Sequence, residues 1–243
     1  MKVLLVGGSG CVGSMVIPHL KSSFMLRVLD PVPPKDASVD YVSGSAIDPA
    51  AVRRALVGTE AVVYMAIGRT PDGRYAMSDI ELNYDLNLKG MHQVLHAAAE
   101  AGIPRAVTTS TMSVHGPWPS GVVANEDTPC DARNLYGFTK ALAEQVCAYF
   151  ARVRGTTVVA LRLNGPVSVE DWHRNCRPDR PNTHTAAPDV ASAVALALTV
   201  PLVGFHALSI SGDYEARRIN CARAKRVLGW EPRERPRGDA SAV

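Results

Sequence analysis

A glycine-rich turn near the start of the chain constrains its fold more than any other feature. Residues 7–13 read Gly-Gly-Ser-Gly-Cys-Val-Gly and follow the apolar run at residues 2–6. The helical pattern Val12–Leu20 follows at once. A lone glycine pattern is weak evidence, but its position between a strand and a helix is the context in which such turns bind phosphate. The segment therefore predicts a strand–turn–helix unit of an α/β fold.

Each glycine of this turn has a physical role. Gly7 and Gly10 permit a tight bend with no side chain between the backbone and a pyrophosphate, and Gly13 lets the helix pack closely on the strand. Free N–H groups at the helix start carry partial positive charge and attract the anion. The predicted contacts are Gly7, Gly10, Cys11, Val12 and Gly13.

Short apolar runs alternate with longer helical segments along the first two thirds of the chain. The predicted strands are Val3–Val6, Leu26–Leu29, Tyr41–Val42, Ala61–Ala66, Ala106–Thr109 and Thr157–Leu163. The predicted helices are Val12–Leu20, Pro49–Leu56, Ile80–Ala101 and Tyr136–Val153. This alternation is typical of βαβ units with right-handed crossovers. We therefore expect an α/β protein with a doubly wound parallel sheet of the Rossmann type.

Acidic residues after the next strands indicate which dinucleotide binds. Asp30 ends the second predicted strand, where a carboxylate accepts hydrogen bonds from adenosine ribose hydroxyls and repels a 2′-phosphate. This favours NAD over NADP, although Asp30 could also simply initiate a turn before Pro31. Asp48 could receive the adenine amino group, cap the helix that begins at Pro49, or do both. Ala66, at the end of the fourth predicted strand, is a further candidate contact.

The texture of the sequence changes after Pro166. Residues 167–187 are rich in Pro, Arg, Asn and His and predict a loop-rich excursion. A helix (Asp189–Thr199), a strand (His206–Ser211) and a last helix (Asn220–Leu228) are predicted to follow. We therefore divide the chain into an NAD-binding Rossmann domain, residues 1–166, and a small substrate-binding lobe, residues 167–243, whose elements partly return to the Rossmann core.

Composition excludes several classes of function. The net charge of +3 and the lack of a clustered basic face argue against a nucleic-acid partner. No run approaches the roughly 18 apolar residues of a membrane helix, and the start of the chain lacks the core of a signal peptide. Five cysteines without a C-x-x-C pair favour reduced thiols in a cytoplasm. His92 and His96 lack the other ligands of a zinc site, so we expect no metal.

Residues 136–140, Tyr-Gly-Phe-Thr-Lys, suggest catalysis. Tyr136 and Lys140 are four residues apart and therefore share one helix face. An ammonium near a phenol favours the phenolate, which can remove a proton from a substrate hydroxyl or return one to a carbonyl. Lys140 would also hydrogen-bond the nicotinamide ribose. Both residues are thus predicted to be catalytic and to contact the cofactor.

Four hydroxyl residues, 108–111, end the fifth predicted strand, where ligands of open α/β sheets bind. Residues 109–116 resemble the SSxxVYG segment of extended short-chain dehydrogenases/reductases, the group of sugar-nucleotide epimerases and dehydratases. Matching backwards from Gly116 places the catalytic hydroxyl on Thr111. Thr replaces the usual Ser there, and His115 replaces the usual Tyr.

Further segments match the same family in order along the chain. Residues 87–90 resemble its NxxGT helix start, residues 161–166 a contracted LRxxNvyGP, residues 189–191 its DvA and residues 228–232 its terminal LGWxP. The resemblance implies that Asn87 braces the active-site helix and lies at the cofactor site. It also implies that NAD is the cofactor.

Only 77 residues follow Pro166, which suits a small substrate. The layout is similar to that of uronate dehydrogenases, in which an Arg beyond the sixth strand binds the substrate carboxylate, a place that Arg174 takes here. Arg177 and Arg180 are alternatives, and Arg174 could equally be a solvated loop charge. The candidate substrate contacts are Ser110, Thr111, Met112, Ser113, Asn164 and Arg174. The subgroup carries Asn-His at 112–113, so recognition of sugar hydroxyls would differ.

We thus expect an NAD-dependent oxidoreductase that acts on a sugar or sugar acid. The alternatives are a nucleotide-sugar epimerase or dehydratase with tightly held NAD, and a cofactor-binding regulator without catalysis on the same fold. A homodimer is compatible with apolar positions on two predicted helices, although core packing would also explain them. These positions are Val94, Leu95, Ala98, Leu142 and Val146.

Overall fold

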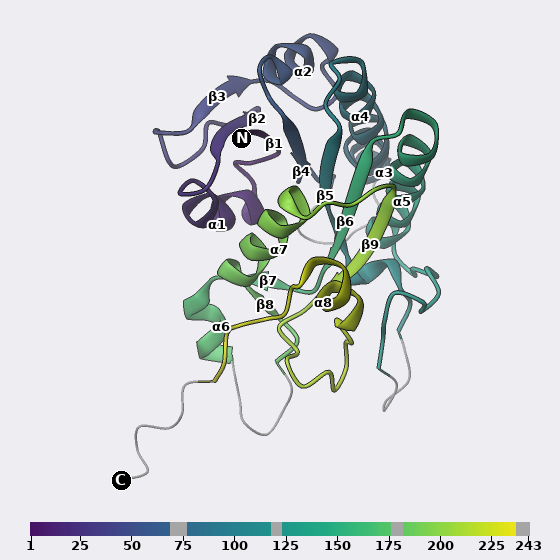
Figure 1. The fold of residues 1–243 in the computed structure, drawn as a ribbon. Coiled ribbons are helices and arrows are strands. Elements are labelled where there is room, and N and C mark those ends of the chain that lie inside the picture. The colour runs from purple at the N-terminus through teal and green to yellow at the C-terminus, as the bar shows by residue number, and fades with distance from the viewer. Residues whose placement is uncertain (69–76, 118–122, 176–181, 237–243) are drawn as a thin grey trace.

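The computed structural model describes residues 1–68, 77–117, 123–175 and 182–236. Seven parallel strands form one sheet in the order β3-β2-β1-β4-β5-β6-β9 (Figure 1). They are β1 (Lys2–Val6), β2 (Met25–Asp30), β3 (Asp40–Ser43), β4 (Ala61–Tyr64), β5 (Arg105–Thr111), β6 (Thr157–Leu163) and β9 (Phe205–Ile210). The strand order reverses between β1 and β4, so the predicted doubly wound parallel sheet is confirmed.

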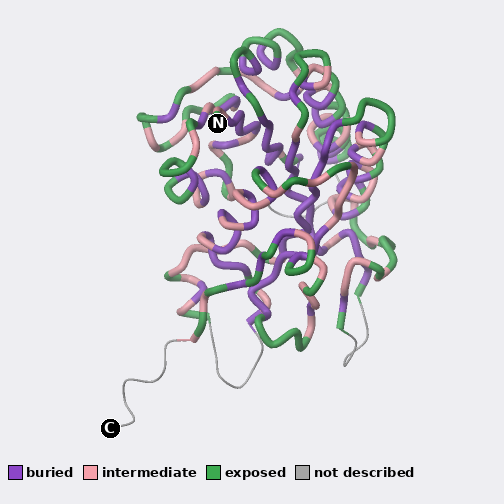
Figure 2. Tube along the Cα trace, viewed as in Figure 1, coloured by how far each residue is buried: buried purple, intermediate pink, exposed green. Residues whose placement is uncertain are grey.

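Helices cover both faces of the sheet (Figure 1). One face carries α1 (Cys11–Leu20), α7 (Ala187–Thr199) and α8 (Ala222–Leu228), and the other carries α2 (Pro49–Leu56), α4 (Met91–Glu100) and α5 (Leu135–Arg154). Side chains alternate along a strand, so Val3 and Leu5 join the first core while Leu4 and Val6 join the second. Burial on both faces explains why this strand is an unbroken apolar run, and Figure 2 shows the central strands buried.

The predicted helix Ile80–Ala101 is three segments in the structure. α3 (Met77–Asn83) and α4 flank a π-helical segment, η1 (Tyr84–Gly90). The Tyr64 hydroxyl donates to the Leu86 carbonyl at 2.5 Å, and a Cβ added to Gly90 would lie 2.7 Å from that hydroxyl. Contact with β4 therefore stabilises the wider turn. Helical periodicity in the sequence carries no signal for it.

The segment predicted to be loop-rich contains a helix, α6 (Val169–Asn175). The Ser168 hydroxyl accepts a hydrogen bond from the Asp171 backbone at 3.0 Å, and the fully buried Trp172 donates to the His184 carbonyl at 2.9 Å. β7 (Pro166–Val167) and β8 (Thr185–Ala186) pair as a separate small sheet. One buried Trp on a seven-residue helix is too little for a periodic pattern, which is why the sequence did not predict it.

The apolar residues of α4 considered for a dimer lie inside the chain's own core. Val94, Leu95 and Ala98 are at most 1% exposed, and Val146 packs against the same cluster. Core packing accounts for them, and a homodimer stays a prediction. No helix in the described ranges is long and apolar enough to cross a bilayer.

Candidate active site

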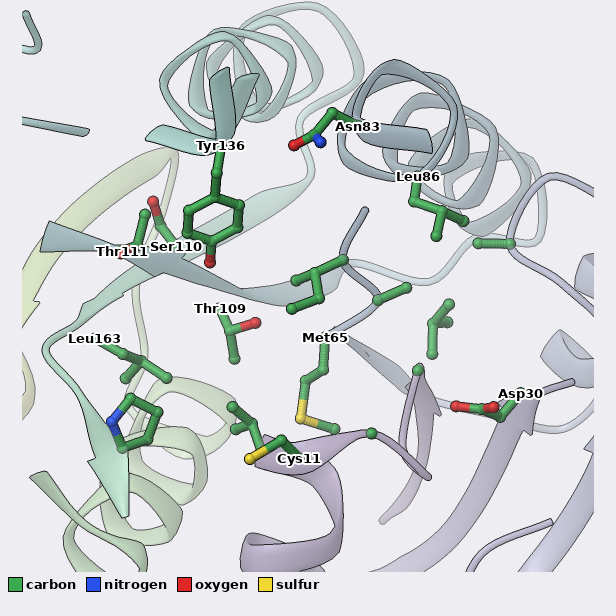
Figure 3. Close-up of a pocket in the computed structure, with 18 of the residues that line it drawn as sticks. Cys11, Asp30, Met65, Asn83, Leu86, Thr109, Ser110, Thr111, Tyr136 and Leu163 are labelled. Carbon is green, nitrogen blue, oxygen red and sulfur yellow. The ribbon is translucent and has the colours of Figure 1, made fainter. Parts of the chain in front are cut away.

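A cavity of about 750 Å³ lies at the carboxyl ends of β1, β2, β4, β5 and β6. Ligands of open α/β sheets bind at this edge, where the strand order reverses. Asp30 and Tyr136 lie at opposite ends of it in Figure 3, so the cavity is elongated. The predicted site residues that line it are Gly7, Gly10, Cys11, Val12, Asp30, Ala66, Ser110, Thr111, Ser113 and Tyr136.

The glycine turn forms one wall of the cavity. Gly7 has a φ of +79°, and a Cβ added there would lie 2.4 Å from the Ala66 backbone nitrogen. A Cβ on Gly13 would lie 2.2 Å from the Gly8 carbonyl oxygen, so α1 starts directly against the turn. α1 begins at Cys11 with Gly10 as its N-cap and no side-chain cap. The N–H groups at its start are therefore available to an anion in the cavity.

The two candidate adenosine contacts differ in position. Asp30 lines the cavity and accepts hydrogen bonds from the backbones of Ser9 (3.1 Å) and Val32 (3.0 Å). It therefore serves the turn and faces the site as well. Asp48 accepts from the backbones of Ala50 (2.9 Å) and Ala51 (3.2 Å) as the N-cap of α2. It is not among the lining residues, whereas the nearby Ser45 and Ala46 are.

The catalytic candidates approach the cavity from two elements. Tyr136 projects into it from α5, on the same side as Ser110 and Thr111 at the end of β5 (Figure 3). The Thr111 side-chain oxygen accepts a hydrogen bond from the Ser113 backbone at 3.1 Å and so caps the short 3₁₀ turn η2 (Met112–Val114). Its own proton can still be donated. A hydroxyl donor and a phenol thus face one space, as transfer of a proton to or from a bound oxygen requires.

Lys140 lies behind this wall and is 1% exposed. Its ammonium nitrogen has no hydrogen-bond partner among the described residues. Burial lowers the pKa of Lys140 to about 8, and the neighbouring acidic groups only partly oppose this effect. A buried, unpartnered ammonium is uncommon and indicates a missing ligand group. Together with the glycine turn and Asp30, it fits a dinucleotide whose ribose hydroxyls would complete it.

Asn87 is fully buried and does not line the cavity. Its side-chain oxygen accepts from the Gly68 backbone at 3.0 Å, and its amide nitrogen donates to Thr139 at 2.9 Å and to Asn83 at 3.1 Å. Thr139 directly precedes Lys140 on α5. Asn87 therefore connects the active-site helix to the segment after β4, and its bracing role stays a prediction.

One protein family matches most of this chain. The NAD dependent epimerase/dehydratase family matches residues 3–204, which include the glycine turn, Thr111, Tyr136 and Lys140. The chain belongs to this family. The resemblance inferred from residues 109–116 is thereby confirmed, and the predicted cofactor, NAD, is the one that the family name carries.

Relatives with different activities resemble the chain to similar degrees. It is 31% identical over 211 residues to a D-erythronate dehydrogenase from Cupriavidus necator, covering 80% of this chain and 61% of that one. It is 32% identical over 148 residues to an N-acetyl-alpha-D-glucosaminyl-diphospho-ditrans,octacis-undecaprenol 4-epimerase from Escherichia coli, covering 59% of this chain and 42% of that one. The chain thus spans about half the length of these relatives.

A solved structure shares the fold across nearly the whole chain. A uronate dehydrogenase variant from Agrobacterium tumefaciens, complexed with NAD, superposes with a TM-score of 0.78 at 18% identity. The match covers 99% of this chain and 92% of that one. At this identity the likeness shows the fold alone.

Three predicted substrate contacts lie outside the cavity lining of this family member. Met112 is buried against Ala124 and Ile219, and the Asn164 amide donates to the Thr183 carbonyl at 2.8 Å. Arg174 is 71% exposed and pairs with Asp171 on α6. Met112 and Asn164 are thus near Thr111 in the sheet but do not line the cavity, and Arg174 is exposed to solvent. Arg177 and Arg180 lie outside the described residues.

Sequence analysis missed one wall of the cavity. Asp79 and Asn83 of α3 and Leu86 of η1 line it, and Figure 3 shows Asn83 beside Tyr136 with Leu86 beyond it, on the side of Asp30. Asp79 and Asn83 are only 5% and 4% exposed. Two polar residues four apart on one helix face were the available signal. It could be interpreted only once α3 was known to pack over the cavity.

Proposed function

We propose that this protein is an NAD-dependent oxidoreductase that transfers hydride between nicotinamide and a carbon of a sugar or sugar acid. One juxtaposition carries the proposal. The Thr111 hydroxyl and the Tyr136 phenol line the same cavity as the glycine turn and Asp30, and the unpartnered Lys140 ammonium lies behind them. Substrate oxygen and cofactor would then meet at one end of an elongated site.

The residues would divide the work as follows. The turn at Gly7 and Gly10 and the start of α1 would hold the pyrophosphate, Asp30 the adenosine ribose and Lys140 the nicotinamide ribose. NAD, when bound, supplies the hydride acceptor or donor. Thr111 accepts from the Ser113 backbone, so its own proton would remain available to the substrate oxygen. Tyr136 would take the hydroxyl proton as the carbon loses hydride, or return it in the reverse direction.

A polyhydroxylated substrate is supported by the wall that contains α3. Asp79, Asn83, Ser113 and Asn134 line the cavity together with Tyr136. Carboxylate, amide and hydroxyl groups suit the hydrogen bonding of sugar hydroxyls. The name of the relative from Cupriavidus necator, a sugar-acid dehydrogenase, supports the same class. A carboxylate on the substrate would need a cation. Arg174 is the predicted cation, and Arg174→Ala tests whether it contributes to the turnover of sugar acids.

The similarity to a 4-epimerase supports a second candidate function, that of an epimerase. An epimerase would use the same Tyr136 and Lys140 but would return the hydride to its own substrate. Net NADH formation separates the two functions, because only the oxidoreductase releases reduced cofactor in each turnover.

The test is NADH absorbance from purified protein with NAD and a panel of aldoses, aldonates and hexuronates. Tyr136→Phe should abolish the signal while keeping NAD affinity, measured by calorimetry. Tyr149→Phe is the matched control, because Tyr149 lies on the same helix, is 42% exposed and does not line the cavity. Equal turnover in the wild type and Tyr136→Phe would overturn the proposal. Isomerised nucleotide sugar without net NADH would favour the epimerase.

A further inference from the structure

A buried carboxylate on α5 lies outside the cavity but interacts with Ser110, the neighbour of Thr111, and with Lys140. Glu144 is four residues after Lys140 and eight after Tyr136, so all three share one face of the helix. Glu144 is 4% exposed and does not line the cavity. Unlike the Lys140 ammonium, its carboxylate already has partners within the protein, so we expect its role to act through other residues.

Both oxygens of Glu144 are engaged in strong hydrogen bonds. Oε1 accepts from the Ser110 hydroxyl at 2.6 Å and from Arg162 Nε at 3.0 Å, and Oε2 accepts from Arg162 Nη2 at 2.8 Å. Ser110 is the residue before Thr111 on β5. Glu144 thus ties the strand that carries Thr111 to the helix that carries Tyr136, one residue from the reacting hydroxyl.

Arg162 of β6 extends the connection to the loop before α5. Its Nη2 donates to the Cys130 sulfur at 3.3 Å, and its Nη1 lies 3.4 Å from His115 Nε2. A guanidinium has no acceptor, so His115 Nε2 accepts and His115 Nδ1 donates to the Pro129 carbonyl at 2.8 Å. Residues 129–130 run into Asn134, which caps α5. The ion pair of Arg162 with Glu144 therefore connects both the loop before Tyr136 and the helix after it.

Stability alone is a poor explanation for this arrangement. Replacing a buried ion pair by apolar residues of similar volume is often neutral or stabilising, because two charges must be desolvated. What a buried bidentate pair does supply is direction, since its hydrogen bonds accept only one geometry. Catalysis needs such geometry, because a displacement of about 1 Å can cost about 100-fold in rate.

We propose that Glu144, held by Arg162, is a positioning residue that sets the placement of Thr111 against Tyr136 and Lys140. The proposal rests on the proposed function. Its charge has a second effect, since a carboxylate one turn from Lys140 opposes the lowering of the Lys140 pKa by burial. A neutral residue of the same shape would remove this effect and lower the pKa of Lys140 further.

The variant Glu144→Gln keeps the shape and removes the charge. We expect kcat to fall by about tenfold to 100-fold with KM for NAD unchanged, and the alkaline limb of the pH–rate profile to move to lower pH. Amide hydrogen exchange of the ligand-free protein should rise in residues 110–115 and 134–140. Arg162→Lys keeps the charge but loses the fork, so it should show the same changes to a smaller degree.

Asp189→Asn is the matched control. Asp189 is a buried carboxylate, 2% exposed, that accepts from the backbones of Arg233 (2.9 Å) and Glu234 (3.2 Å). It should lower the melting temperature while leaving kcat, the pH profile and exchange in the two segments unchanged.

Two results would overturn the proposal. One is a Glu144→Gln protein with the wild-type pH profile and no greater loss of kcat than the control. The other is unchanged exchange in residues 110–115 and 134–140, which is decisive even if no substrate is turned over. Failure of the wild type to reduce NAD, with exchange altered as expected, would refute the proposed function but support the positioning role.

Discussion

Two buried cations of the active-site region differ in their hydrogen-bond partners. Lys140 and Arg162 are 1% and 5% exposed. Arg162 donates to the Glu144 carboxylate, the Cys130 sulfur and the Glu126 carbonyl, whereas the Lys140 nitrogen has no partner in the part of the chain that the structure describes. Folding alone completes the first site, and a ligand would have to complete the second. An unsatisfied buried polar group is costly and needs a specific explanation, and for Lys140 we propose a bound ligand.

Replacing Lys140 by Met would have the largest effect and tests this contrast directly. Turnover should fall by about 100-fold or more, because the phenolate of Tyr136 loses its neighbouring cation. The free energy of unfolding of the ligand-free protein should stay the same or rise by about 1 kcal/mol, because an unpaired buried charge is removed. Urea unfolding and steady-state rates measure the two quantities. A clear loss of stability would show that Lys140 is paired after all.

The same residue makes stability depend on pH. The pKa of Lys140 is lowered from 10.5 to about 8, so the unfolded chain binds the proton more tightly than the folded one. The folded protein is therefore most stable, with respect to this group, above the unfolded pKa of 10.5. That stability is lost as the pH falls through the folded pKa of about 8. As the pH rises from about 8 to 10.5, the free energy of unfolding of the ligand-free wild type should therefore increase relative to that of Lys140→Met. Parallel curves for the two proteins would contradict this assignment.

Arg162→Met should lower stability, in contrast to Lys140→Met. It leaves the Glu144 carboxylate buried without its cation, which costs about 3–5 kcal/mol of folding free energy. The double variant Arg162→Met with Glu144→Leu should recover most of this loss, because neither charge is then stranded. Urea unfolding of the single and double variants decides. Equal instability in both would mean that packing, and not the unpaired charge, dominates.

His115 provides a smaller, pH-dependent test of the same network. Burial lowers the pKa of His115, and it faces Arg162 from β6, Glu144 from α5 and Asp131 from the loop before α5. A lowered pKa means that stability is present above the usual value of 6.5 and is lost as pH falls through the folded value. His115→Phe should flatten this acid limb in thermal unfolding. An unchanged slope would assign the limb to other groups.

Asp48→Ala should have the smallest effect on stability, and it serves as a control outside the cavity. Loss of an N-cap should cost about 1 kcal/mol of stability, measured by urea unfolding. NAD affinity should be unchanged, because Asp48 does not line the cavity. Weaker binding of NAD together with this loss would show that Asp48 also reaches the adenine.

Local patterns determined much of this protein. The glycine turn, the alternation of strands and helices and the four-residue spacing of Tyr136 and Lys140 each depend on residues close in sequence. The doubly wound fold and the catalytic candidates could therefore be predicted. The same holds for the cap at Asp48, which a short-range hydrogen bond defines. Family membership followed because these local signals occur in a fixed order.

Tertiary structure decided what depends on residues far apart in sequence. The ion pair of Arg162 with Glu144 joins a strand and a helix, and the π-helical turn at 84–90 depends on a hydroxyl from β4. Asp79 and Asn83 became part of the site only through the packing of α3. Arg174, predicted from the resemblance to uronate dehydrogenases, lies exposed beside Asp171. The physical reason is the same in each case. Hydrophobic period and turn chemistry encode the elements, but the partner of a buried polar group is set by which elements pack together.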